Sequence, residues 1–153
     1  MTQKADDIEI KEKAAGDDIE AICDIERACF SDPWSYESIK SELDNPFGLY
    51  AIAYDGTRVV GYIMGTVLYE DCDINNVAVL PEYRRRGVGR RMMESFLVRC
   101  RVKGAKRVLL EVRESNLAAI GLYAAFGFAV IGKRRDYYDD PREDAVLMEV
   151  EIC

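Results

Sequence analysis

Two glycines in an arginine-rich turn form the first group of residues whose types and spacing could do chemistry. The segment Arg84-Arg85-Arg86-Gly87-Val88-Gly89-Arg90 lies between an apolar run and a stretch with helical periodicity. Glycine lets backbone amides approach an anion without obstruction by a Cβ, and a helix N-terminus offers unpaired N–H groups. The segment therefore predicts a pyrophosphate site, with a solvated basic turn as the alternative. It lacks the third glycine of a Rossmann fingerprint and the Gly-Lys-Ser/Thr of a P-loop.

A carboxylate, an amide and a phenol form a second group further along the chain. Glu111 follows the apolar run Val108-Leu109-Leu110, and Asn116 and Tyr123 come after it. Asn116 is placed to cap a helix, and Tyr123 lies on the same helical face, about 10 Å further along the axis. Carboxylate and phenol groups can act as general base and general acid. The alternatives are a carboxylate at the rim of a sheet, a simple helix cap and a core tyrosine.

The absence of histidine limits the chemistry that is open to this chain. Ser–His and Cys–His nucleophile pairs are excluded, and so are most zinc sites, so we expect no metal. Any acid–base step must use carboxylate, tyrosine, cysteine, lysine or water. The 21 basic and 28 acidic residues give a net charge of −7, which argues against a dedicated nucleic-acid binder.

The cysteines and the apolar pattern are typical of a reduced, cytoplasmic protein. The chain has five cysteines, an odd number, and no C-x-x-C pair, so we expect buried thiols rather than disulfides. The segment from Met1 to Asp7 has no apolar stretch of the kind found in signal peptides. No window approaches the ~18 apolar residues of a membrane span.

Hydrophobic periodicity predicts the elements that must position these groups. We expect strands over residues 7–13, 49–54, 59–68, 73–80, 107–112, 129–135 and 145–151. We expect helices from Asp17 or Asp18 to about Phe30, from Ser35 to before Asn45-Pro46, and over residues 88–103 and 116–126. This order is not the repeating βα of a doubly wound fold. It predicts one α/β (α+β) domain over residues 1–153, with a mixed sheet covered by helices and a β–α–β unit from Asp73 to Val112.

Taken together, two motifs resemble the coenzyme A signature of the GNAT N-acetyltransferases. They are Arg84 to Arg90 and Asn116-x-x-Ala119-x-x-Leu122-Tyr123-x-x-x-Gly127-Phe128, in that order. Within this superfamily the chain is similar, over residues 8–152, to the RimI-type ribosomal-protein-alanine N-acetyltransferases. The segments that carry this likeness are Phe30-x-x-Pro33-Trp34-Ser35, Asn76-Val77-Ala78-Val79, Leu110-Glu111-Val112-Arg113 with Ser115-Asn116, Tyr137-Tyr138 and Glu143-Asp144-Ala145.

The resemblance implies a fold and a way of binding acetyl-CoA, with no metal. The GNAT acyl-CoA N-acyltransferase fold has a central mixed, mostly antiparallel sheet flanked by helices, and its splayed parallel strands form the CoA slot. Val77, Ala78 and Val79 would pair through their backbones with the pantetheine arm, and Asn116 would bind the same arm. The pyrophosphate would be held by amides of Arg85, Arg86, Gly87, Val88, Gly89 and Arg90. Arg84 stands where many relatives have glutamine, which does not disturb binding through the backbone.

The resemblance also implies the reaction and the residues that carry it. Glu111 matches the general base of the family, and Tyr123 matches its general acid. Trp34, Tyr137 and Tyr138 would bind the substrate, with Glu143 and Asp144 near the mouth of the site. The implied reaction is direct attack, in a ternary complex, by the N-terminal α-amine of a protein on the acetyl thioester. The usual substrate of the family is the N-terminal alanine of a small-subunit ribosomal protein.

Two other functions stay open at this point. One is acetylation of a lysine side chain or a small amine on the same scaffold, and the other is a non-catalytic CoA-binding module. Tyr137-Tyr138 and Glu143-Asp144 favour the peptide substrate, and the pair Glu111 and Tyr123 argues against a module without activity. We expect the chain to be a monomer or weak dimer whose partner is a ribosomal-protein N-terminus, with no direct nucleic-acid binding and no membrane.

Overall fold

The computed structural model describes residues 7–14, 16 and 18–152. Its strands are β1 (Ile8–Lys11), β2 (Gly48–Asp55), β3 (Arg58–Leu68), β4 (Asp71–Val79), β5 (Arg107–Arg113), β6 (Ala129–Tyr138) and β7 (Glu143–Glu151). Its helices are α1 (Asp18–Cys29), α2 (Tyr36–Leu43), α3 (Val88–Val102) and α4 (Leu117–Ala125), with a short 3₁₀ turn at Pro81–Tyr83. The described strands form one sheet in the order β1-β2-β3-β4-β5-β7-β6.

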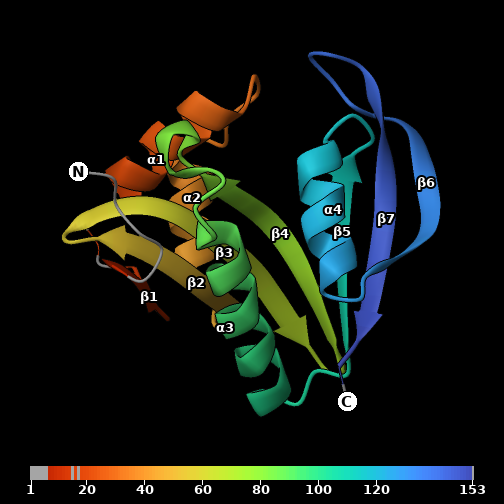
Figure 1. Ribbon diagram of the computed structural model, residues 1–153, viewed down its shortest axis with the longest axis horizontal. Coiled ribbons are helices and arrows are strands. Elements are labelled where there is room, and N and C mark those ends of the chain that lie inside the picture. The colour runs from red at the N-terminus through yellow and green to blue at the C-terminus, as the bar shows by residue number, and fades with distance from the viewer. Residues whose placement is uncertain (1–6, 15, 17, 153) are drawn as a thin grey trace.

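The sheet is antiparallel except where β4 meets β5. These two strands pair in parallel only over Asp71↔Arg107, Cys72↔Val108 and Asp73↔Leu109, and then diverge into a V that is visible in Figure 1. The register between β3 and β4 shifts beside Met64, which pairs with Asn76, while the next residue pairs with Ile74. Such a bulge bends a strand, and here it follows directly on the last β4–β5 pair. The predicted mixed, mostly antiparallel sheet with splayed parallel strands is confirmed.

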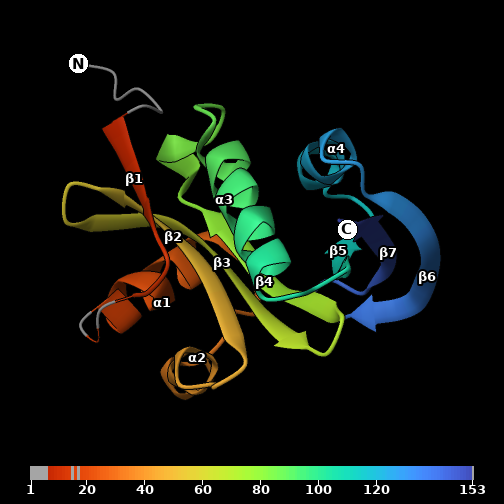
Figure 2. The ribbon, with the colours of Figure 1, turned by 90° about the horizontal axis from the view of Figure 1, so that it is seen from below.

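The helices lie on both faces of the sheet. Figure 2 shows α3 and α4 on one face, above the two arms of the V, and α1 and α2 on the other face below β2 and β3. The predicted helix over residues 88–103 is confirmed as α3, and the residues of its apolar face are buried: Val88, Met92, Met93, Phe96, Leu97 and Cys100. None of the helices in the described part of the chain has the length and apolar character that crossing a bilayer needs.

The bounds of α1 and the state of the cysteines agree closely with the predictions. Asp18 is the first residue of α1, and the alternative start at Asp17 lies outside the described residues, as does Cys153. Phe30 lies one residue beyond the end of α1, although its amide still donates to the Glu26 carbonyl at 2.9 Å. Among the described cysteines, Cys23, Cys72 and Cys100 are buried free thiols, as expected.

The hairpin of β6 and β7 is longer than the sequence pattern predicted. β6 continues to Tyr138 instead of ending at residue 135, and β7 begins at Glu143 instead of residue 145. The reason is a register irregularity between Arg134 and Tyr138, which breaks the alternation that marks a regular strand. Asp136 has a positive φ of 52°, and its amide donates to the Asp144 carboxylate at 2.9 Å.

Candidate active site

The edge of β4 that faces β5 is the first component of the site. On its other side β4 stays paired to β3, through Ile63↔Val77, Tyr62↔Ala78 and Gly61↔Val79. Within the described chain, no strand covers the β5-facing edge of β4 beyond Asp73. An uncovered strand edge presents N–H and C=O groups to an extended ligand that carries amides of its own. The predicted residues Val77, Ala78 and Val79 lie on this open edge.

The N-terminus of α3 is the second component, and it follows β4 directly. Gly87 is the N-cap in the left-handed region, at a φ of 80°, and its missing side chain leaves no side-chain cap on the helix. Arg85 also has a positive φ, 63°. The first turn of α3 contains no acidic residue, so its amides and the helix dipole present a positive end to an anion.

Two arginine side chains of this turn are engaged by protein groups. Arg84 donates through Nε to the Val79 carbonyl at 3.2 Å, and Arg86 lies 5.3 Å from the ring centroid of Tyr83. The backbone amides, more than these two side chains, are therefore the groups that the turn leaves available to an anion. Gly89 also has a packing reason to be glycine, because a Cβ there would lie 3.3 Å from Leu122 Cδ2 on α4.

Glu111 lies on β5, two residues beyond its last pair with β4. Val108, Leu110 and Val112 are buried, so the alternation of the strand puts Glu111 on the opposite face. Its side chain is 30% exposed, and one carboxylate oxygen lies 3.3 Å from Arg134 Nε. The other arm of the V is close by, because Glu111 contributes, after burial and Asp71, to raising the pKa of Asp73 on β4. Glu111 is thus a partly open carboxylate that faces the splayed region.

Tyr123 and Asn116 both belong to α4. Tyr123 is only 5% exposed, and its ring centroid lies 5.8 Å from that of Phe128. Burial, and after it the nearby Tyr138, raises the pKa of Tyr123, so its phenol keeps its proton at neutral pH. Asn116 is the N-cap of α4, and its side-chain oxygen accepts from the Ala119 amide at 3.2 Å. Tyr123 is therefore a core residue and Asn116 is a helix cap, as the structural alternatives for these two residues predicted.

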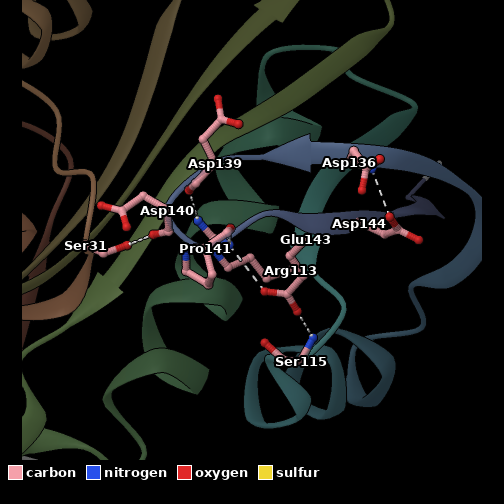
Figure 3. A network of polar contacts seen from close by, with 9 residues as sticks. All are labelled: Ser31, Arg113, Ser115, Asp136, Asp139, Asp140, Pro141, Glu143 and Asp144. Atoms are coloured by element: carbon pink, nitrogen blue, oxygen red, sulfur yellow. Dashed lines mark hydrogen bonds and ion pairs between the residues drawn. The ribbon is translucent and has the colours of Figure 1, made fainter.

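Two of the three predicted substrate-binding aromatics meet at Glu111. Tyr137 and Tyr138 pack edge to face with their ring centroids 5.0 Å apart. The pKa of Tyr137 is raised, first by the neighbouring Glu111 carboxylate. Trp34 comes from the other arm of the V, on the connector between α1 and α2. That connector touches the β6–β7 hairpin, because the Ser31 hydroxyl donates to the Asp140 carbonyl (Figure 3).

This geometry agrees with comparisons of the chain with known proteins. The model of the Acetyltransferase (GNAT) family matches residues 19–128. The chain belongs to the GNAT family. A Bacillus subtilis protein, named as a candidate [ribosomal protein bS18]-alanine N-acetyltransferase, is 38% identical over 137 residues, or 89% of this chain and 91% of the relative. The crystal structure of the Escherichia coli ribosomal-protein-S18-alanine N-acetyltransferase superposes with a TM-score of 0.87 at 31% identity, covering 95% of this chain and 94% of that one.

The GNAT fold also extends to more distant structures with a bound cosubstrate. Arabidopsis thaliana NAA60 in complex with acetyl-CoA superposes with a TM-score of 0.83 and covers 95% of this chain and 98% of its own. At 17% identity this likeness concerns the fold alone.

A buried carboxylate in this GNAT chain escaped the sequence reasoning. Glu26 on α1 is fully buried and accepts three hydrogen bonds: from the Trp34 amide at 2.8 Å, from Asn76 Nδ2 at 2.6 Å and from the Tyr62 hydroxyl. It therefore ties the connector that carries Trp34 to β4, directly before Val77. The signal was present, because Glu26 continues the apolar helical stripe of Ile19, Ile22 and Cys23.

Proposed function

We propose that this chain transfers the acetyl group of acetyl-CoA to the N-terminal α-amine of a protein, most specifically to the N-terminal alanine of a small-subunit ribosomal protein. The observation that carries the proposal is the position of Glu111. It is a partly open carboxylate beside the V, next to the Tyr137-Tyr138 pair. The relatives that match this chain over nearly their whole length are named for this reaction.

The residues of the V fit the cosubstrate that the family uses. The open edge from Val77 to Val79 would pair with the amides of the pantetheine arm, and the backbone from Arg85 to Arg90 would hold the pyrophosphate. Because the side-chain oxygen of Asn116 caps α4, its amide nitrogen would be the group that faces the cosubstrate. Acetyl-CoA supplies the activated thioester, and the other steps fall to the side chains of the protein.

Glu111 and Tyr123 would move the two protons of the reaction. An α-amine has a pKa of about 7.7–8, so a carboxylate can take its proton near neutral pH, directly or through a water. The neutral amine attacks the thioester carbonyl, the C–N bond forms, and the C–S bond breaks. The leaving thiolate takes a proton from the Tyr123 phenol, and the proton that the nitrogen loses on becoming an amide restores that phenol through solvent. Burial disfavours a thiolate as it does a phenolate. The pKa of the CoA thiol and the pKa of the Tyr123 phenol would therefore both be raised in the same buried site.

The acids expected near the mouth need a revised assignment. The Glu143 carboxylate accepts from the Ser115 amide at 2.5 Å, and Asp144 accepts from the Asp136 amide at 2.9 Å. Glu143 is thus engaged by the segment from β5 to α4, and Asp144 is engaged by β6. The exposed acids beside the point where the connector meets the hairpin are Asp32, Asp139 and Asp140. We assign to these the attraction of a basic peptide, which salt would weaken.

The same proposal extends to the whole chain. The continuous sheet from β1 to β6 supports a single domain over residues 1–153. We propose that it acts in the cytoplasm, where ribosomal proteins are made, as a monomer or weak dimer without direct contact with nucleic acid or membrane.

A peptide panel tests the substrate. The peptides share a basic tail and differ in their first four residues, beginning with alanine, serine, glycine or methionine, and CoA release is measured. The alanine-initiated peptide should give the highest kcat/KM, and acetylating its α-amine beforehand should abolish release. Equal release from the blocked peptide would contradict the proposal.

A further inference from the structure

Arg113 contacts the hairpin formed by β6 and β7 through several hydrogen bonds. It lies on β5, two residues after Glu111. Its Nη1 donates to the Pro141 carbonyl at 2.9 Å and to the Glu143 carboxylate at 3.3 Å, and its Nη2 donates to the Asp139 carbonyl at 2.9 Å (Figure 3). One side chain thus holds both sides of the hairpin tip.

Ring and carboxylate contacts complete the hold of Arg113 on the hairpin. The guanidinium lies 4.5 Å from the ring centroid of Tyr138, within the range of a cation–π interaction. The pair with Glu143 is mostly buried, with side chains 26% and 17% exposed. Glu143 is itself fixed by Ser115, and the pKa of its carboxyl is lowered, first by Ser115 and then by Arg113.

The hairpin tip depends on these contacts because the strand ladder does not hold it. Between the pairs Arg134↔Ala145 and Tyr138↔Glu143 the register is irregular, and no pair follows Tyr138↔Glu143 toward the tip. On its other side the tip meets Ser31, on the connector that carries Trp34. The tip therefore spans from the β5 arm of the V to the connector at its other arm.

We propose that Arg113 is a positioning residue, which holds the hairpin tip at residues 139–141 and the Tyr138 ring over the path of the peptide between Glu111 and Trp34. This inference rests on the proposed function, and it assigns the affinity for the peptide substrate to the hairpin that Arg113 holds. Arg113 acts through the hairpin and not on the reacting atoms. Its effect therefore falls on the substrate residues after the first one, and not on acetyl-CoA.

The test removes the planar guanidinium of Arg113 but keeps its positive charge. Arg113→Lys cannot donate to two carbonyls and a carboxylate at once. Arg107→Lys is the matched control, because Arg107 lies on the same strand and pairs with Asp71 at 2.9 Å, at the end of β5 away from Glu111. Glu143→Gln is a second variant, which weakens the same contact from the hairpin side. Each variant is assayed with an alanine-initiated hexapeptide, with the corresponding dipeptide amide and with varied acetyl-CoA.

The expected result is a selective loss. Arg113→Lys should raise KM for the hexapeptide about tenfold and Glu143→Gln about threefold, with KM for acetyl-CoA within twofold of the parent. The advantage of the hexapeptide over the dipeptide should shrink in both variants and persist in Arg107→Lys. Unchanged hexapeptide KM, or an equal rise for the hexapeptide, the dipeptide and acetyl-CoA, would overturn the proposal.

Amide hydrogen exchange gives a readout that needs no substrate. The Ser115 amide, which donates to the Glu143 carboxylate, and the Glu114 amide, which donates to the Asp144 carbonyl, should exchange at least tenfold faster in Arg113→Lys than in the parent or in Arg107→Lys. Unchanged exchange would show that Arg113 does not hold the tip. A parent that acetylates lysine side chains but no α-amine would instead contradict the proposed function, and the exchange result would still decide the role of Arg113.

Discussion

At the scale of single residues, Glu111 is held from two sides and remains open to solvent. Arg134 and Tyr137 contact its carboxylate, and nearly a third of the side chain is exposed. A proton acceptor in an enzyme needs this combination, since it must be fixed toward the substrate and must also return its proton to water. Tyr123 has the opposite surroundings, a buried phenol whose raised pKa keeps it protonated.

Replacing Glu111 by glutamine should lower kcat by about 10²–10⁴-fold without changing acetyl-CoA affinity. The loss should be greatest below about pH 8, where the substrate amine is still partly protonated and needs a base. Because the pKa of Tyr123 is raised above its ordinary value of about 10, ionisation of Tyr123 should not limit the rate of the parent enzyme below about pH 10. A pH–rate profile superimposable on that of the parent would remove Glu111 as the base.

Glu26 should matter for stability as much as for the site. Glu26→Ala leaves the buried Tyr62 hydroxyl and the half-buried Asn76 amide without this acceptor, and a buried group left in this way costs about 1–3 kcal/mol. We expect the free energy of unfolding in urea to fall by about 3 kcal/mol. Glu20→Ala is the control, because Glu20 is exposed on the same helix. An equal, small effect of both substitutions would contradict the described network.

At the scale of elements, the turn between β4 and α3 joins the open strand edge to a helix N-terminus. Gly87 supplies the left-handed conformation there, and Gly89 lets α3 approach α4. These are separate reasons for two glycines that both resemble anion-binding positions in the sequence.

Gly87→Val and Gly89→Val should weaken acetyl-CoA binding more than peptide binding. A Cβ obstructs the approach of a pyrophosphate to the amides, and at Gly87 it also strains the positive φ. Gly121→Ala is a suitable control, because a Cβ at Gly121 meets nothing within 4 Å. Calorimetry that finds unchanged cosubstrate affinity in both valine variants would exclude the phosphate assignment.

The elements also show where sequence reasoning is strong and where it ends. The position of α3 and the number and order of the strands followed from apolar periodicity, because burial imposes it on a regular element. The bulge beside Asn76 and the irregular end of β6 break that periodicity, so their consequences were not predicted. Contacts between distant segments, such as Arg113 with the hairpin and Glu26 with Trp34, depend on tertiary structure. The roles of the site residues remain predictions.

At the scale of the whole molecule, the two arms of the sheet are joined both at the vertex of the V and across its open end. At one end, the parallel pairs from Asp71 to Asp73 join β4 to β5. At the other, the Ser31 hydroxyl and the Asp140 carbonyl join the connector to the hairpin. Between them lie the open edge of β4, Glu111 and the tyrosine pair. A flexible chain terminus suits this bridged site better than a side chain on a folded surface.

The most direct test of this account locates the acetyl group by mass spectrometry. Three peptides begin with alanine and carry a basic tail: one with an internal lysine, one with that lysine replaced by arginine, and one with the lysine and a blocked α-amine. We predict one acetyl group on the α-amine of the first two peptides, at equal rates, and none on the third. Acetylation of the lysine in the blocked peptide would contradict the N-terminal assignment, while the membership of the chain in the GNAT acetyltransferases would stand.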